Sequence, residues 1–109
     1  MKLPTLDTIL GEMEEILLRN GMETHAAIVQ NLRSTKDPAP FSEEAVSLSI
    51  WGGSGSVVDA SMSDPADARR FDELIVDLAE ALEQLGLTSP RIQWVAQTIE
   101  DWLIAHPTQ

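Results

Sequence analysis

Residues 64–87, DPADARRFDELIVDLAEALEQLGL, decide the fold class. Asp64 can cap a helix, Pro65 suits the first helical position, and Asp67 stands where a capping box places its acid. Gly86 fits a left-handed cap at the C-terminal end. Between these signals the apolar side chains recur every three or four residues, which predicts a long amphipathic helix. Its predicted stripe consists of Phe71, Leu74, Ile75, Leu78, Leu82 and Leu85.

The next helix repeats the same kind of start signal at Ser89-Pro90 and is expected to end before His106-Pro107. Because only a tight turn separates it from the helix before it, the two should form a helical hairpin. Its predicted buried face consists of Ile92, Val95, Ala96, Ile99, Trp102 and Leu103.

A second hairpin is predicted at the N-terminal end of the chain. Apolar residues at helical spacing from Leu6 to Leu17 predict a helix that Asn20-Gly21 ends. A weaker pattern predicts another helix from about Glu23 to Arg33. The following segment, residues 34–40, contains two prolines within three residues and is expected to be a connector.

The middle of the chain supports two interpretations. Ser42-Glu43-Glu44 resembles a helix start, whereas residues 46–50 alternate like a strand. We expect a short helix here, with a short strand pair as the alternative, and residues 57–62 fit either an extended segment or a helical turn. The predicted fold is therefore a mainly α single domain, residues 1–109, of four to five helices with an irregular glycine-rich middle segment.

Charge is the strongest compositional feature of the chain. Eighteen Asp and Glu against seven Lys and Arg give a formal net charge of -11. A surface of this sign repels a polyanion, so nucleic-acid binding is not expected. A basic protein partner would be attracted instead, although acidity that serves solubility alone explains the same composition.

The expected compartment is the cytoplasm. The chain contains no cysteine, which fits a reducing environment. Its first residues lack the pattern of an export signal, and its apolar runs are far shorter than the roughly 20 residues that span a bilayer. We therefore expect no membrane association.

No catalytic constellation is visible, and we expect neither enzymatic activity nor a cofactor. His25 and His106 are the two histidines, and neither has metal-ligand spacing to a partner. Neighbouring carboxylates such as Glu14-Glu15 point in different directions on a helix and are typical of a solvated face. No metal site is predicted.

The glycine-rich stretch from Trp51 to Ser56, WGGSGS, is the most distinctive local motif. Glycines permit positive φ and close backbone approach, and successive amides can hold an anion. A phosphate loop would also need a Lys near its end, and Val57 and Val58 stand there. A structural turn and a partner-contacting loop both remain open.

Trp94 is predicted to point away from the buried stripe of its helix. It is therefore either an interface anchor or a side chain that packs on the middle segment, and Trp51 carries the same two interpretations. Together with the acidic pair before the loop, these features give a candidate partner-binding set of Trp51, Gly52, Gly53, Gly55, Asp59, Glu43, Glu44 and Trp94.

Residues 48–59, LSIWGGSGSVVD, followed by a long amphipathic helix, resemble a family of small bacterial proteins of unknown function. That family combines an N-terminal helical hairpin, a central Gly-Gly-x-Gly-Ser motif with a nearby aspartate, and C-terminal helices. The likeness covers roughly residues 5–86, and Val58 replaces an Asn that often precedes the Asp. Some members are proposed to be immunity proteins of toxin systems, so the resemblance implies an inhibitor.

The leading hypothesis from the sequence is a non-catalytic protein whose acidic surface binds a basic partner, as an immunity or inhibitor protein would. One alternative is a small-ligand or regulatory module that uses the glycine-rich loop and Asp59. Another is a homodimer that pairs helices through Trp94.

Overall fold

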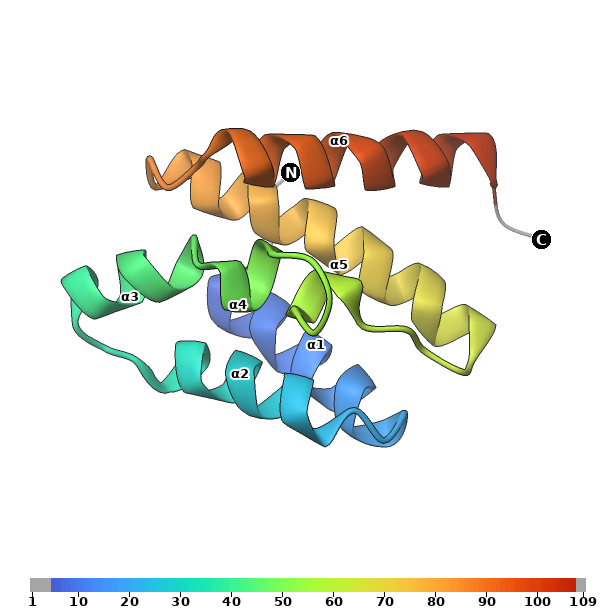
Figure 1. Ribbon diagram of the computed structural model, residues 1–109, viewed down its shortest axis with the longest axis horizontal. Helices are drawn as coiled ribbons and strands as arrows, with labels where there is room; N and C mark the ends of the chain where they lie inside the picture. The colour runs from blue at the N-terminus through green and yellow to red at the C-terminus, as the bar shows by residue number, and fades with distance from the viewer. Residues whose placement is uncertain (1–4, 108–109) are drawn as a thin grey trace.

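Two pairs of long helices enclose a middle segment of short ones (Figure 1). The computed structural model describes residues 5–107, which contain five α-helices of eight residues or more, one single-turn helix and one 3-10 turn. No strand occurs among these residues, so the mainly α prediction is confirmed and the strand-pair alternative is wrong. The elements are α1 (Leu6–Arg19), α2 (Glu23–Ser34), α3 (Pro38–Ala45), α4 (Leu48–Trp51), η1 (Val57–Asp59), α5 (Pro65–Gln84) and α6 (Pro90–Ala105).

The first hairpin, α1 and α2, forms where the sequence predicts it. Thr5 caps α1, since its hydroxyl accepts a hydrogen bond from the amide of Thr8 at 3.2 Å. Gly21 takes φ 75°, a left-handed conformation that lets the chain reverse after α1. The face of α1 that points inward consists of Ile9, Leu10, Met13, Ile16 and Leu17, all of them buried.

The second hairpin, α5 and α6, confirms the predicted caps. The Asp64 carboxylate accepts from the amide of Asp67 at 2.9 Å, and the Ser89 hydroxyl accepts from the amide of Ile92 at 3.2 Å. At the end of α5, Gly86 has φ 76° and the next amide, that of Leu87, donates back to the Leu82 carbonyl at 2.9 Å. Both helices therefore begin at the predicted capping residues.

The start of α3 corrects the sequence prediction. Pro38 occupies the first helical position and Pro40 lies in the first turn, where the backbone amides have no intrahelical partner and proline costs little. Ser42 is not a cap, because its hydroxyl donates to the Pro38 carbonyl at 2.8 Å from within the helix. The predicted connector is thus shorter, and the helix starts five residues earlier than a cap at Ser42 would place it.

The predicted stripe of α6 is only half right. Ile92 and Val95 are buried, but Trp102 is 48% exposed and Leu103 is partly exposed. The reason is visible in Figure 1: α5 and α6 diverge away from their connecting turn, so the last turns of α6 lie apart from the start of α5. At the end of α5, Leu85 was also predicted in the stripe and is 59% exposed.

Trp51 stands at the centre of the core and is fully buried. Its indole Nε1 donates to the Ala45 carbonyl at 2.7 Å, so the one polar atom of the ring has a partner. All five longer helices contribute buried side chains to the same cluster, among them Leu32 and Phe71. The middle segment is therefore anchored from inside.

Ion pairs fasten α1 to α5. Arg19 contacts Asp67 through two hydrogen bonds of 2.9 and 2.6 Å, and Asn20 donates to the same carboxylate at 2.9 Å. Two turns earlier on α1, Glu12 accepts two hydrogen bonds from Arg70 at 2.6 and 2.9 Å. The hydrogen bonds from Arg19 and Asn20 lower the pKa of Asp67 to about 2.

Among residues 5–107, no helix combines the length and the apolar character needed to cross a bilayer.

Truncation of the central tryptophan, Trp51, should strongly destabilise the protein. Trp51→Ala removes a fully buried indole and leaves a cavity, and large-to-small changes of this kind cost about 3–5 kcal/mol. Urea unfolding followed by circular dichroism measures the change. Trp94→Ala is the matched control, since a 63% exposed tryptophan should change the unfolding free energy by less than about 1 kcal/mol. Equal effects of the two substitutions would contradict the assigned core.

Asp67→Asn should alter the acid stability of the protein. Because the folded-state pKa of Asp67 is about 2, below its ordinary 3.8, the ionised group stabilises the fold above about pH 4 and loses this effect as the pH falls towards 2. The difference in unfolding free energy between wild type and Asp67→Asn should therefore shrink over that range. A difference that stays constant from about pH 4 to about pH 2 would contradict the stabilising role of the ionised Asp67.

Candidate functional site

The glycine-rich loop is held together largely by its own residues. A side chain at Gly52 would overlap the carbonyl oxygen of Leu48, so the backbone approach there requires glycine. Ser56 is buried and its hydroxyl donates to the Gly52 carbonyl at 2.5 Å. Of the two interpretations made from the sequence, the structural turn accounts for this part of the loop.

The exposed part of the loop contains Gly53, Gly55 and Asp59. Gly55 takes φ 87°, and its amide donates to the Asp59 carboxylate at 3.3 Å. An anionic ligand would need this amide as a hydrogen-bond donor, and the amide already donates to Asp59. The loop and its aspartate form one local unit, as the sequence motif suggested, but the aspartate points back to the loop itself.

The remaining candidates lie on other elements. Glu43 is exposed and Glu44 half-buried on α3, whereas Trp94 is 63% exposed on α6. Trp51 is buried, so of its two interpretations packing in the core applies, and for Trp94 the exposed orientation applies. No hydrogen bond or ion pair within residues 5–107 joins Glu43, Glu44 or Trp94 to the loop.

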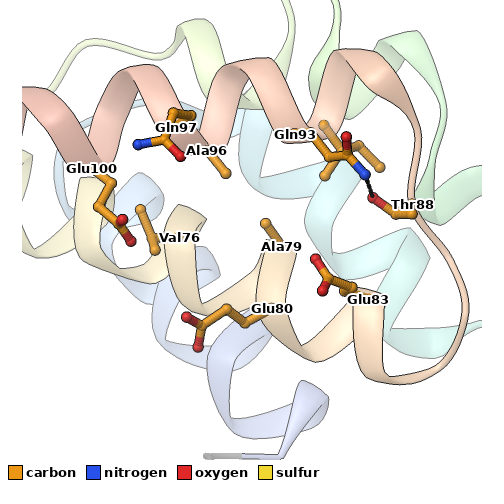
Figure 2. Close-up of a pocket in the computed structure, with 10 residues that line it drawn as sticks. Val76, Ala79, Glu80, Glu83, Thr88, Gln93, Ala96, Gln97 and Glu100 are labelled. Atoms are coloured by element: carbon orange, nitrogen blue, oxygen red, sulfur yellow. Dashed lines mark hydrogen bonds between the residues drawn. The ribbon is translucent and has the colours of Figure 1, made fainter.

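Sequence reasoning missed a groove between α5 and α6, with a volume of about 170 Å³. Its floor is apolar and its rim bears three carboxylates together with polar groups (Figure 2). The apolar members are Val76, Ala79, Ile92 and Ala96, and the polar members are Glu80, Glu83, Glu100, Thr88, Gln93 and Gln97. We call this surface the acidic groove.

The carboxylates of the acidic groove have no cation beside them. Glu80, Glu83 and Glu100 form no ion pair within residues 5–107. From Phe71 to the end of the described chain, one Arg or Lys is present, Arg91. Over the same stretch the acidic residues are Asp72, Glu73, Asp77, Glu80, Glu83, Glu100 and Asp101.

Three arginines form ion pairs with carboxylates outside the acidic groove. Arg19 pairs with Asp67, Arg33 reaches Asp7 at 2.9 Å, and Arg70 pairs with Glu12. Two of these pairs join α1 to α5, and the pair of Arg33 with Asp7 joins α2 to α1. The formal charge of the protein is therefore unevenly distributed, and α5 and α6 carry much of the unpaired negative charge.

Apolar side chains lie exposed next to this charge. α6 presents Trp94, Trp102 and Ile104 with exposed fractions of 63%, 48% and 73%. The Trp102 ring stacks on His106 with a centroid separation of 4.3 Å. Exposed tryptophan beside unpaired carboxylates is typical of an interface that binds both apolar and cationic groups.

No group of three or more His, Cys, Asp or Glu side chains in the described part of the chain is arranged to hold a metal ion. A signal for the groove was present in the sequence, because Glu80 and Glu83 on one predicted helix and Gln93, Gln97 and Glu100 on the next follow helical spacing. Their meeting across the hairpin depends on the helix rotation, which spacing alone does not fix.

No protein-family model matches the chain, and neither the curated proteins nor the solved structures contain a significant match. The resemblance to the bacterial Gly-Gly-x-Gly-Ser family therefore stays a prediction.

The structural part of the loop can be tested by two neighbouring substitutions. Gly52→Ala forces the new methyl group against the Leu48 carbonyl and should destabilise the protein by about 1–3 kcal/mol. Gly53→Ala has no atom within 4 Å of the added carbon and should change stability by less than about 1 kcal/mol. Thermal unfolding of both variants measures these changes in stability. A Gly52→Ala variant as stable as wild type would refute the close approach of residue 52 to the Leu48 carbonyl.

Proposed function

We propose that the protein is a non-catalytic binding protein that recognises a basic protein partner through the α5–α6 hairpin. The observation that carries the proposal is the acidic groove, in which Glu80, Glu83 and Glu100 surround an apolar floor and form no ion pair within residues 5–107. Desolvated apolar area supplies affinity, and unpaired carboxylates supply attraction to a cationic surface.

The biological role that fits such a surface best is inhibition. A small acidic protein that covers a basic functional surface of another protein would block it, which is how the resemblance to proposed immunity proteins enters the proposal. Long-range attraction between opposite charges also speeds association, an advantage for an inhibitor that must capture its target quickly.

The two other hypotheses have less support. A small-ligand module would use the glycine-rich loop, but the Gly55 amide is already bonded to Asp59. A homodimer through Trp94 has the exposed side chain it needs, yet each copy carries a formal charge of -11 and the two would repel each other. A basic partner would both cover the exposed Trp94 side chain and be attracted by the negative charge.

Charge reversal in the acidic groove should abolish partner binding. The test variant is Glu80→Lys/Glu83→Lys/Glu100→Lys, and the matched control is Glu15→Lys/Glu23→Lys/Asp37→Lys, which changes the net charge equally at exposed positions elsewhere. The tagged proteins are used to capture partners from lysate of the source cells at 50 and 300 mM salt, a variation chosen because salt screens such attraction.

We expect wild type and control to retain a basic protein at low salt and the groove variant to lose it. With the isolated partner, the association rate constant of the groove variant should fall about tenfold or more. Equal loss in the control would mean that net charge alone drives binding, and full retention by the groove variant would exclude the groove.

A further inference from the structure

The turn that ends α1 contains an asparagine followed by a glycine, Asn20-Gly21. The side-chain amide of an asparagine can be attacked by the backbone nitrogen of the next residue, and glycine obstructs this approach least because it has no side chain. The other asparagine of the chain, Asn31, precedes Leu32, whose bulky side chain hinders the same attack. Asn20 is therefore the asparagine at which deamidation is chemically favoured.

The folded structure holds the side chain of Asn20 away from this reaction. Its Nδ2 donates to the Ile16 carbonyl at 2.8 Å and to the Asp67 carboxylate at 2.9 Å. Its Oδ1 accepts from the Ser63 hydroxyl and from the Asp64 amide, both at 3.3 Å. These four hydrogen bonds fix the side chain in place, and turning it towards the next backbone nitrogen would break them.

The attacking nitrogen is held as well. The Gly21 amide donates to the Leu18 carbonyl at 3.1 Å, and Gly21 takes φ 75° in the turn. Ring closure needs the Gly21 nitrogen and the Asn20 Cβ on the same side of the bond between Cα and the carbonyl carbon of Asn20. The observed ψ of 12° at Asn20 holds these two atoms well apart. The reaction therefore requires the end of α1 to open locally.

The contacts that protect Asn20 lie at the junction between α1 and α5. Asp67 is in the first turn of α5, where it also accepts two hydrogen bonds from Arg19 at 2.9 and 2.6 Å, and Asp64 is the cap of the same helix. Separation of the end of α1 from the start of α5 would remove three of the four hydrogen bonds of the Asn20 side chain, those with Ser63, Asp64 and Asp67. The protection of Asn20 thus depends on this junction.

We propose that Asn20 is a deamidation site that the α1–α5 junction keeps closed, and that its conversion releases the junction irreversibly. In the first step the Gly21 nitrogen forms a bond to Cγ of Asn20, and the bond between Cγ and Nδ2 breaks. The proton of the Gly21 amide goes with the side-chain nitrogen, which leaves as ammonia. Water then adds to either carbonyl carbon of the cyclic imide and opens the ring, so that aspartate or isoaspartate stands at position 20. This inference is independent of the proposed function.

The product cannot restore the junction. A carboxylate at position 20 donates no hydrogen bond, so the Ile16 carbonyl and the Asp67 carboxylate both lose their donor. It also brings a negative charge to the place where the amide nitrogen lay 2.9 Å from Asp67, and two carboxylates so close together repel each other. Isoaspartate adds a methylene group to the main chain as well. Either product therefore weakens the contact between α1 and α5.

The test follows deamidation of the full chain in mildly alkaline buffer by mass spectrometry of proteolytic peptides, since the exchange of an amide for a carboxyl group changes the peptide mass. Wild type is incubated with and without urea, and Asn31 in the same samples is the internal control. Asp67→Ala removes the acceptor of Asn20 on α5. Glu12→Ala is the matched control, because it breaks the neighbouring α1–α5 ion pair with Arg70 and leaves the contacts of Asn20 in place.

We expect Asn20 in the folded wild type to convert about tenfold or more slowly than in urea, because the reaction waits for local opening. Asp67→Ala should speed conversion in native buffer about fivefold or more, and Glu12→Ala less than about twofold. Asn31 should keep its amide over the same time. Equal rates in folded and unfolded wild type would overturn the protection, and equal rates in the two variants would overturn the role of the junction. No conversion of Asn20 in urea would overturn the site itself.

Two further measurements keep the inference testable if Asp67→Ala does not fold. In wild type, hydrogen exchange of the Gly21 amide should be slowed about tenfold or more relative to the unfolded chain, and an unprotected amide would overturn the closed state. Asn20→Asp, which reproduces one product, should lower the urea concentration at the midpoint of unfolding. Asn31→Asp adds the same charge at an exposed position and should leave the midpoint nearly unchanged. An unchanged midpoint in Asn20→Asp would overturn the release of the junction.

Discussion

The ion pairs that converge on α1 are the interaction on which the rest of the structure depends. Arg19 and Arg70 fasten α1 to α5, and Arg33 fastens α2 to α1. Each exposed pair adds little stability by itself, but together they fix the orientation of one helical hairpin against the other. They engage three of the seven Lys and Arg residues of the chain. On the α5–α6 hairpin, Glu80, Glu83 and Glu100 form no ion pair within the described residues.

The core explains why the distinctive loop is not the best candidate for a functional site. Trp51 is buried, and its indole bonds to Ala45, so the motif begins inside the protein. Gly52 is required by close packing against α4, and the Asp59 carboxylate closes the turn on Gly55. The loop thus lets the middle segment fill the space between the two hairpins. The sequence of the loop is explained by packing, and the proposed binding surface lies on the amphipathic helices α5 and α6.

The four long helices were predictable because their signals are local. Asp64, Ser89 and Gly86 act within one helical turn, and an apolar stripe needs only its own spacing. The start of α3 was missed because proline was taken as a breaker, although it is tolerated in a first turn. The acidic groove and the uncovered end of α6 were beyond sequence reasoning for a different reason. Both depend on how far α5 and α6 diverge, which is decided by packing against α1 and the middle segment.

The account places partner recognition on α5 and α6, and amide NMR mapping tests this placement most directly. The ¹⁵N-labelled full chain is titrated at low salt with an 18-residue peptide that places Lys and Leu at the spacing of an amphipathic helix, and chemical-shift changes are assigned along the sequence. The account predicts that the changes concentrate at residues 66–83 and 93–106 and vanish at high salt. Changes concentrated at α3 and the glycine-rich loop, residues 43–59, would contradict it and return the site to the surface first indicated by the sequence motif.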